Sequence, residues 1–238
     1  MSGHNKWSKI QHKKGVLDHR RGKVFSVISK EITVAARAGG GDVNFNVRLR
    51  AAVDKAKAEN MPADNITRAI QKGTGEIPGI VYEEIIYEGY GPAGVGIIVE
   101  VTTDNKNRSA GEVRATFTKH GGNMAGAGAV SFNFQRRGQI IVARDAATED
   151  ALMELALGAG AEDLQSFDTH YEVLTTPHGH PAVADALTKA GIPMASSEVA
   201  FLPSVTVPIS ADDAAKLQTL TDALEELDDV QYVWTNAP

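Results

Sequence analysis

The chain has 238 residues, of which 42% are hydrophobic and 23% are charged, as in an ordinary globular protein with one to three packed cores. It contains no cysteine, which excludes disulfides, thiolate zinc sites and a cysteine nucleophile. Residues 1–7 lack an apolar signal-peptide region, and no apolar run reaches the ~20 residues of a membrane span. We therefore expect a cytoplasmic protein with no membrane partner.

The formal net charge of −6 conceals a strong division along the chain. Residues 1–72 hold 15 Lys and Arg against 6 acidic residues, whereas residues 73–238 hold 9 against 24. The net charges are therefore +9 and −15. Clustered charge of one sign focuses the electric field on a polyanion. The division predicts a basic contact module carried on an acidic body.

Most of the positive charge lies in residues 1–23, which we call the basic arm. It has one acid, Asp18, and interleaves its cations with Trp7 and three histidines. Cations neutralise phosphates and flat rings stack on exposed bases, so this mixture suits nucleic acid. The predicted contacts in the arm are Lys6, Trp7, Lys9, Lys13, Lys14, Arg20, Arg21 and Lys23. The alternative is a solvated, charged tail.

Three short helices are expected after the arm. The first runs from an N-cap at Asp18 to about residue 37, and the second spans 44–59, with Phe45 on its apolar face beside Leu49. The third begins at Pro62 and ends at Gly73, which suits a C-cap. Their apolar faces predict a small basic bundle over residues 24–75.

The pattern then changes to strands. Residues 80–88 and 95–103 predict a hairpin whose loop contains the letters G-x-G-x-x-G. A dinucleotide site needs a helix after those glycines, and here a strand follows, so a hairpin loop is the better interpretation. A helix is expected at 106–120. It is followed by a glycine-rich segment at 121–128, whose flexibility would suit a hinge or a close backbone crossing, and a strand at 129–135.

The remaining elements predict a β-α-β-β-α-β unit, which is the ferredoxin-like arrangement. Its strands and helices are expected at 139–144, 147–159, 162–167, 170–175, 179–190 and 197–202. A short strand at 205–208, a helix at 211–226 and a strand at 230–235 complete the chain. We expect an α+β, multidomain fold with an N-terminal three-helix domain and two α/β domains. Residues 80–135 and 204–238 would form one discontinuous α+β domain, with the ferredoxin-like domain, 136–203, inserted into it.

A second group of cations surrounds the helix expected at 106–120. Residues 104–137 have a net charge of +4, which leaves −19 on the rest of the body. This basic island suits a second phosphate contact, and the alternative is an ordinary solvated helix face. Its members are Lys106, Arg108, Arg114, Lys119 and His120, extended by Arg136 and Arg137.

Two other classes of function are weaker on this sequence. An enzyme would need a reactive constellation, but His178 and His180 are flanked by prolines without a carboxylate that completes a metal site. We therefore predict no catalysis, metal, cofactor or small-molecule substrate. A protein-interaction scaffold is the other alternative, because the acidic body could bind a basic partner or could serve solubility.

Four internal blocks and the start of the chain resemble one family. The start reads Gly3-His4-Asn5-Lys6-Trp7-Ser8-Lys9-Ile10-Gln11-His12-Lys13-Lys14. The blocks are Asn60-Met61-Pro62-Ala63-Asp64-Asn65-Ile66, Gly73-Thr74-Gly75-Glu76, Tyr87-Glu88-Gly89-Tyr90-Gly91-Pro92 and Thr103-Asp104-Asn105-Lys106-Asn107-Arg108. Together they resemble the YebC/PmpR family, which includes the mitochondrial translational activator of cytochrome oxidase subunit one.

The resemblance covers the whole chain and implies three domains and a role in gene expression. It implies a probable transcriptional regulator that binds DNA, with a translation factor associated with RNA or the ribosome as the alternative. Lys6, Trp7, Lys9, Lys13 and Lys14 match the opening motif. Lys106, Asn107 and Arg108 match the last block and join the predicted nucleic-acid contacts. Arg20, Arg21 and Lys23 rest on charge alone.

Overall fold

The computed structural model describes residues 21–238, and residues 1–20 lie outside the described part. The helical bundle consists of α2 (Arg21–Gly39), α3 (Val47–Ala58) and α4 (Ala63–Thr74). Apolar residues at helical spacing meet in one core, which includes Ile28, Ile32 and Leu49. The three predicted helices are therefore confirmed, with α3 beginning three residues later than expected, while the N-cap expected at Asp18 lies outside the described residues.

Two details of the bundle differ from the sequence predictions. Phe45 precedes α3 and is 87% exposed, because the N-cap of α3 is Asn46. Gly73 lies inside α4 rather than at its C-cap, which is Gly75 in the left-handed conformation (φ 82°). A Cβ on Gly73 would lie 2.5 Å from the carbonyl oxygen of Thr33, so glycine permits α2 and α4 to approach closely.

Sheet A has the strand order β3-β1-β2-β8. Its strands are β1 (Glu83–Tyr90), β2 (Gly96–Thr103), β3 (Asn123–Ala125) and β8 (Val230–Thr235), all antiparallel to their neighbours. The β1–β2 hairpin, joined by the short helix η1 (Pro92–Gly94), confirms the interpretation of the glycine motif as a loop. Two helices, α5 (Lys106–Lys119) and α8 (Ala211–Glu225), pack their apolar residues on one face of this sheet.

Sheet B has the order β5-β6-β4-β7 and contains the predicted β-α-β-β-α-β unit. Its strands are β4 (Phe134–Ala143), β5 (Asp163–Ser166), β6 (His170–Thr175) and β7 (Ser196–Pro203). The helices α6 (Glu149–Gly158) and α7 (His180–Lys189) cover one face through a core that includes Leu152, Val173 and Leu187. The expected α+β fold class is thus confirmed.

Three strand predictions need correction. Residues 129–135 and 139–144 were expected as separate strands, but 129–133 precede the single strand β4, which continues from 134 to 143. The fourth strand of sheet A is β3, which lies inside the glycine-rich segment expected to be flexible. Residues 205–208 form no strand. The domain division stays a prediction, and its boundary at 135/136 falls inside β4.

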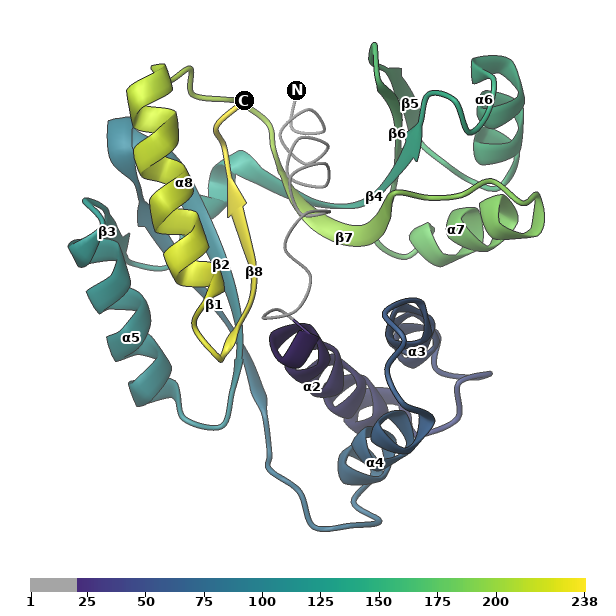
Figure 1. Ribbon diagram of the computed structural model, residues 1–238, viewed down its shortest axis with the longest axis horizontal. Coiled ribbons are helices and arrows are strands. Elements are labelled where there is room, and N and C mark those ends of the chain that lie inside the picture. Colours follow the sequence, from purple (N-terminus) through teal and green to yellow (C-terminus); the bar gives the residue numbers. More distant parts are fainter. Residues whose placement is uncertain (1–20) are drawn as a thin grey trace.

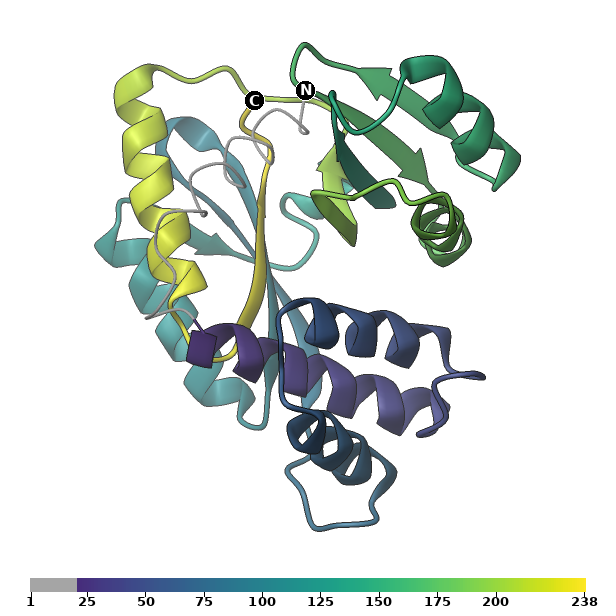
Figure 2. The ribbon, with the colours of Figure 1, turned by 45° about the vertical axis from the view of Figure 1, so that its right-hand side comes forward.

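Figure 1 shows α8 in front of the strands of sheet A, α6 and α7 to the right of sheet B, and the bundle below sheet B. The two sheets meet through Ile98 and Trp234 from sheet A and Phe134 and Ala200 from sheet B. Figure 2 shows α2 passing beneath β8, with α3 beside it. Among residues 21–238 no helix combines the length and apolar content needed to cross a membrane.

Candidate nucleic-acid interface

Most of the predicted arm contacts fall outside the described residues. These are Lys6, Trp7, Lys9, Lys13, Lys14 and Arg20. Arg21 is the first residue of α2, so the helix begins within the stretch that we called the basic arm. The structure therefore describes where the arm joins the body, and the role of its residues stays a prediction.

Lys23 helps to fix that attachment. Its Nζ donates a hydrogen bond to the carbonyl oxygen of Leu227, in the turn between α8 and β8. Burial lowers the pKa of the Lys23 ammonium, although neighbouring carboxylates led by Asp228 oppose the shift. The start of α2 is thus tied to the body by one of the cations predicted to contact nucleic acid.

A buried carboxylate, Asp229, joins the bundle to sheet A. It accepts hydrogen bonds from Lys30 Nζ at 2.8 Å and Arg108 Nη2 at 2.6 Å, and from the hydroxyls of Ser109 and Thr103 at 2.8 and 2.9 Å. Burial opposes ionisation of Asp229, but these donors outweigh it and hold its pKa well below the ordinary carboxyl value. We call this group the Asp229 cluster.

The loop block predicted to bind nucleic acid lies beside this cluster. Lys106 pairs with Glu83 at 2.5 Å, and Arg108 pairs with Asp104 and Asp229 at 2.8 and 2.6 Å. Asn107 is exposed on the first turn of α5. The structure brings the three residues together on one helix, but it gives both cations carboxylate partners within the body. Nucleic-acid binding by these residues stays a prediction.

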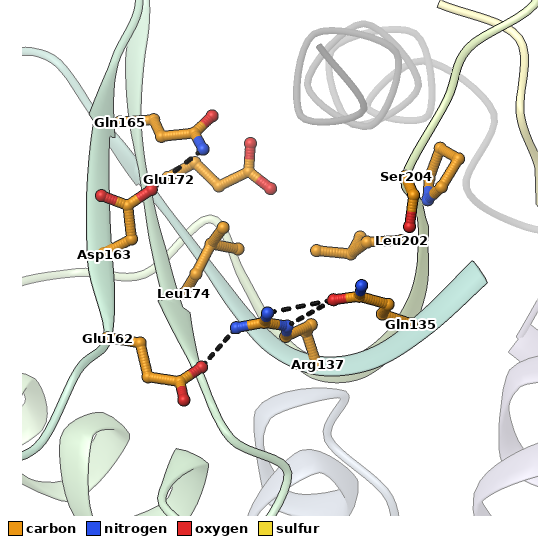
Figure 3. A pocket seen from close by; sticks show the side chains of 10 residues that line it. Gln135, Arg137, Glu162, Asp163, Gln165, Glu172, Leu174, Leu202 and Ser204 are labelled. Carbon is orange, nitrogen blue, oxygen red and sulfur yellow. Dashed lines mark hydrogen bonds and ion pairs between the residues drawn. The ribbon is translucent and has the colours of Figure 1, made fainter. Parts of the chain in front are cut away.

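The two arginines that extend the island lie on β4 and are also paired. Arg136 is 3.6 Å from Glu100, and its guanidinium lies over the ring of Phe201. Arg137 forms an ion pair with Glu162 and donates to Gln135 at the edge of a hollow of roughly 400 Å³ on sheet B (Figure 3). Glu162, Asp163 and Glu172 line the same hollow, so its charge does not favour a phosphate.

Lys55 connects the bundle to sheet A. From α3 it reaches Glu31 of α2 at 3.2 Å and the hydroxyl of Tyr232 on β8. Burial disfavours the charged Lys55 ammonium, but Glu31 and Tyr232 outweigh burial and raise the pKa of Lys55. The pKa of the Tyr232 hydroxyl is also raised, first by burial and then by Glu31. Glu198 of β7 adds to both shifts. The group fixes the bundle against sheet A.

Comparison with known proteins identifies the family of this chain. The model of the TACO1/YebC N-terminal domain matches residues 5–76, and that of the TACO1/YebC second and third domain matches residues 82–237. The chain belongs to the TACO1/YebC family. It is 57% identical to a probable transcriptional regulatory protein of Geobacter sulfurreducens, over 99% of this chain and 95% of that protein. It is 54% identical to one from Opitutus terrae, over 99% and 96%.

A solved structure supports the same placement. The crystal structure of a conserved hypothetical protein from Aquifex aeolicus matches with a TM-score of 0.85 and 46% sequence identity. The match covers 94% of this chain and 92% of that one. The resemblance found in the sequence motifs is therefore confirmed along nearly the whole chain.

In this family member, a smaller fraction of the Lys and Arg side chains is ion-paired in the bundle than in the rest of the described chain. Residues 76–238 hold nine Lys and Arg, and seven of them form ion pairs with carboxylates. Residues 24–75 hold eight, of which only four do so with other described residues. The four bundle cations without such a pair are Arg37, Arg50, Arg68 and Lys72, all exposed. The bundle, which follows the basic arm in the sequence, is thus the less neutralised part of the described chain.

His180, one of the two histidines considered as reactive residues, lies in the packed interior of its domain. His180 begins α7, and its Nε2 lies 2.9 Å from Ser197 Oγ. Burial lowers the pKa of His180, which favours the neutral imidazole. Within residues 21–238, no group of three or more His, Asp or Glu side chains is placed to hold a metal ion.

Sequence reasoning missed two exposed aromatic side chains. Phe45 is 87% exposed and Phe132, in the short helix η2 (Ser131–Asn133), is 82% exposed. The N-cap signal at Asn46 could have placed Phe45 outside α3, since asparagine is a preferred N-cap and the helix then begins at Val47. No comparable local signal marks Phe132 as exposed.

Proposed function

We propose that this chain is a non-enzymatic regulator of gene expression, acting in the cytoplasm, that binds nucleic acid through the basic arm and the bundle. The distribution of charge is the observation that most supports this proposal. Residues 1–23 have a net charge of +6 and lead directly into a bundle with a net of +3. Half of the bundle's cations lack a carboxylate partner among the described residues. Phosphate binding requires accessible cations of this kind.

Duplex DNA is the first candidate target, because the relatives are named probable transcriptional regulatory proteins. The acidic remainder of the chain supports the proposal in a second way. A net charge of −15 over residues 73–238 repels a polyanion, so only the basic side would dock. Lys106, Asn107 and Arg108 would join this contact if phosphate displaced the carboxylate partners of Lys106 and Arg108.

Structured RNA, alone or in the ribosome, is the second candidate, and α3 provides an argument for it. Reading duplex DNA usually requires a helix whose side chains reach into the major groove. On α3, Arg48, Lys55 and Lys57 pair with carboxylates, and Arg50 donates to backbone carbonyls. A basic arm with Trp7 suits partly unstacked RNA better than a duplex.

A competition experiment tests the proposal and separates the targets. Duplex DNA would compete with structured ribosomal RNA and with ribosomes for the full chain at near-physiological salt. A variant lacking residues 2–14 loses four lysines, so the slope of log affinity against log salt should become shallower by up to about 4. A matched control, Lys189→Ala with Lys216→Ala, removes cations paired on α7 and α8 and should leave the slope unchanged.

The outcomes lead to different conclusions. Preferential binding to one duplex would support transcriptional control, and preferential binding to RNA or ribosomes would support translational control. Affinity that is independent of salt and unchanged by the deletion would refute the role of the arm. Absence of binding to all three would refute the proposed function.

A further inference from the structure

Phe45 is the most exposed of the large apolar side chains in residues 21–238. It lies in the loop between α2 and α3, where the helical pattern of the sequence had placed it in the core. The core does not need it, because α3 contributes Leu49, Ala52, Val53 and Ala56 instead. A phenylalanine exposed to this extent leaves its whole ring surface available to a ligand.

Asn46, the next residue, fixes the backbone of the loop that carries Phe45. The buried Asn46 Nδ2 donates to the carbonyl oxygens of Ala35 and Gly40, each at 2.8 Å. Its Oδ1 accepts the backbone N–H of Leu49 at 3.0 Å. One side chain therefore ties together the end of α2, the loop and the start of α3.

Hydrogen bonds also fix the backbone of the two residues before Phe45. Arg50 Nε donates to the carbonyl oxygen of Val43 at 2.9 Å, and its Nη2 donates to that of Asn44 at 2.5 Å. Asp42 Oδ1 accepts the backbone N–H of Asn44 at 2.8 Å. A braced loop presents an aromatic ring with little conformational entropy left to lose on binding.

The charge around Phe45 distinguishes it from Phe132. Residues 37–50 contain Arg37, Arg48 and Arg50 against Asp42, a net of +2, and the Arg50 guanidinium lies against the backbone just before Phe45. Residues 121–135, which contain Phe132, include no Lys, Arg, Asp or Glu. Of these two described rings, Phe45 is the one that combines exposure with local cations, which is the combination found in single-strand binding sites.

We propose that Phe45 is a stacking platform for an unpaired nucleobase, with the net positive charge of residues 37–50 favouring the adjoining phosphates. This proposal rests on the proposed function and narrows its ligand to nucleic acid that is single-stranded at the bundle. In a duplex both faces of each base are already stacked, so Phe45 reaches a base face only where a base is unpaired or flipped out. RNA loops meet this requirement directly.

The test compares single-stranded and duplex forms of one sequence, using the full chain. An RNA oligonucleotide of about 12 nucleotides, which is within the usual site size, would be titrated by fluorescence anisotropy. Phe45→Ala should weaken single-strand binding roughly 5- to 150-fold and leave duplex binding unchanged. Phe45→Trp should keep the affinity, and its indole fluorescence should be quenched by the single strand.

Phe132→Ala is the matched control, since it removes an equally exposed ring from an uncharged loop. It should bind both forms like the original chain. Equal affinity of Phe45→Ala and the original chain for the single strand would overturn the proposal, as would an equal loss with Phe132→Ala. If the original chain binds neither form, the stacking proposal is overturned, and the proposed function is decided by the competition between duplex DNA, structured ribosomal RNA and ribosomes. If it binds both and only the Phe45 prediction fails, the proposed function survives.

Discussion

Replacing Asp229 with alanine should weaken the attachment between the bundle and sheet A more than any surface change. The side chains of Lys30 and Asp229 are only 10% and 6% exposed. Removal of one partner from a buried ion pair costs about 3–5 kcal/mol, because the other charge remains buried without compensation. Lys30 keeps the carbonyl oxygens of Thr102 and Asp228 at 3.2 and 2.8 Å, so we expect the lower end, about 3 kcal/mol.

Urea unfolding at pH 7, followed by circular dichroism of the helices, would measure this loss. Asp228→Ala is the matched control, because it removes the same charge from the neighbouring, exposed position, and it should cost less than about 0.5 kcal/mol. A double variant, Asp229→Ala with Lys30→Met, removes the stranded charge and should recover part of the stability. A loss for Asp229→Ala no greater than that of the control would refute the reasoning.

The same cluster predicts a dependence of stability on acid. The pKa of Asp229 is lowered in the folded chain, so its contribution is complete above the unfolded value of about 3.9. It is lost as the pH falls from that value through the lower folded pKa. The difference in unfolding free energy between the original chain and Asp229→Ala should therefore shrink as the pH falls below about 4.

Two further predictions concern packing and loop structure. Gly73→Ala should destabilise the chain by about 1–3 kcal/mol in thermal unfolding, because its Cβ would lie 2.5 Å from the Thr33 carbonyl oxygen. Gly111→Ala, in α5 with open space around the new Cβ, should instead stabilise by about 0.5–1 kcal/mol, and equal effects would contradict the packing argument. Glu88→Gln should speed amide hydrogen exchange at 128–131, where Glu88 accepts three backbone N–H groups. Unchanged exchange there would show that the carboxylate does not hold the loop.

The sequence predicted most helices and strands, because apolar spacing and helix caps are set by residues that lie close together along the chain. The spacing of Ile28 and Ile32 marks the buried face of α2, and Asn105, a residue type that favours the N-cap, caps α5. The strand at 230–235 was predicted with its observed bounds. Strand β3 was missed because three residues in a glycine-rich segment carry no period, and their pairing with β1 comes from a distant part of the chain.

For the candidate interface too, contacts between distant parts of the chain could not be predicted. The basic arm and the charge division could be read directly, because charge belongs to the residue itself. Whether a cation is available for phosphate depends on which carboxylate lies beside it. Arg108 meets Asp229 across 121 residues and Lys55 meets Tyr232 across 177. No local pattern reports such pairs.

The sequence alone therefore determined the family, the α+β class and the polarity of charge, since these follow from motifs, periodicity and composition. Tertiary structure decided which of those charges are paired and which apolar residues are exposed. Phe45 shows the physical reason. The apolar pattern placed it on the buried face of the second helix, but the buried Asn46, which joins the end of α2 to the start of α3, caps a helix that begins at Val47 and leaves Phe45 exposed.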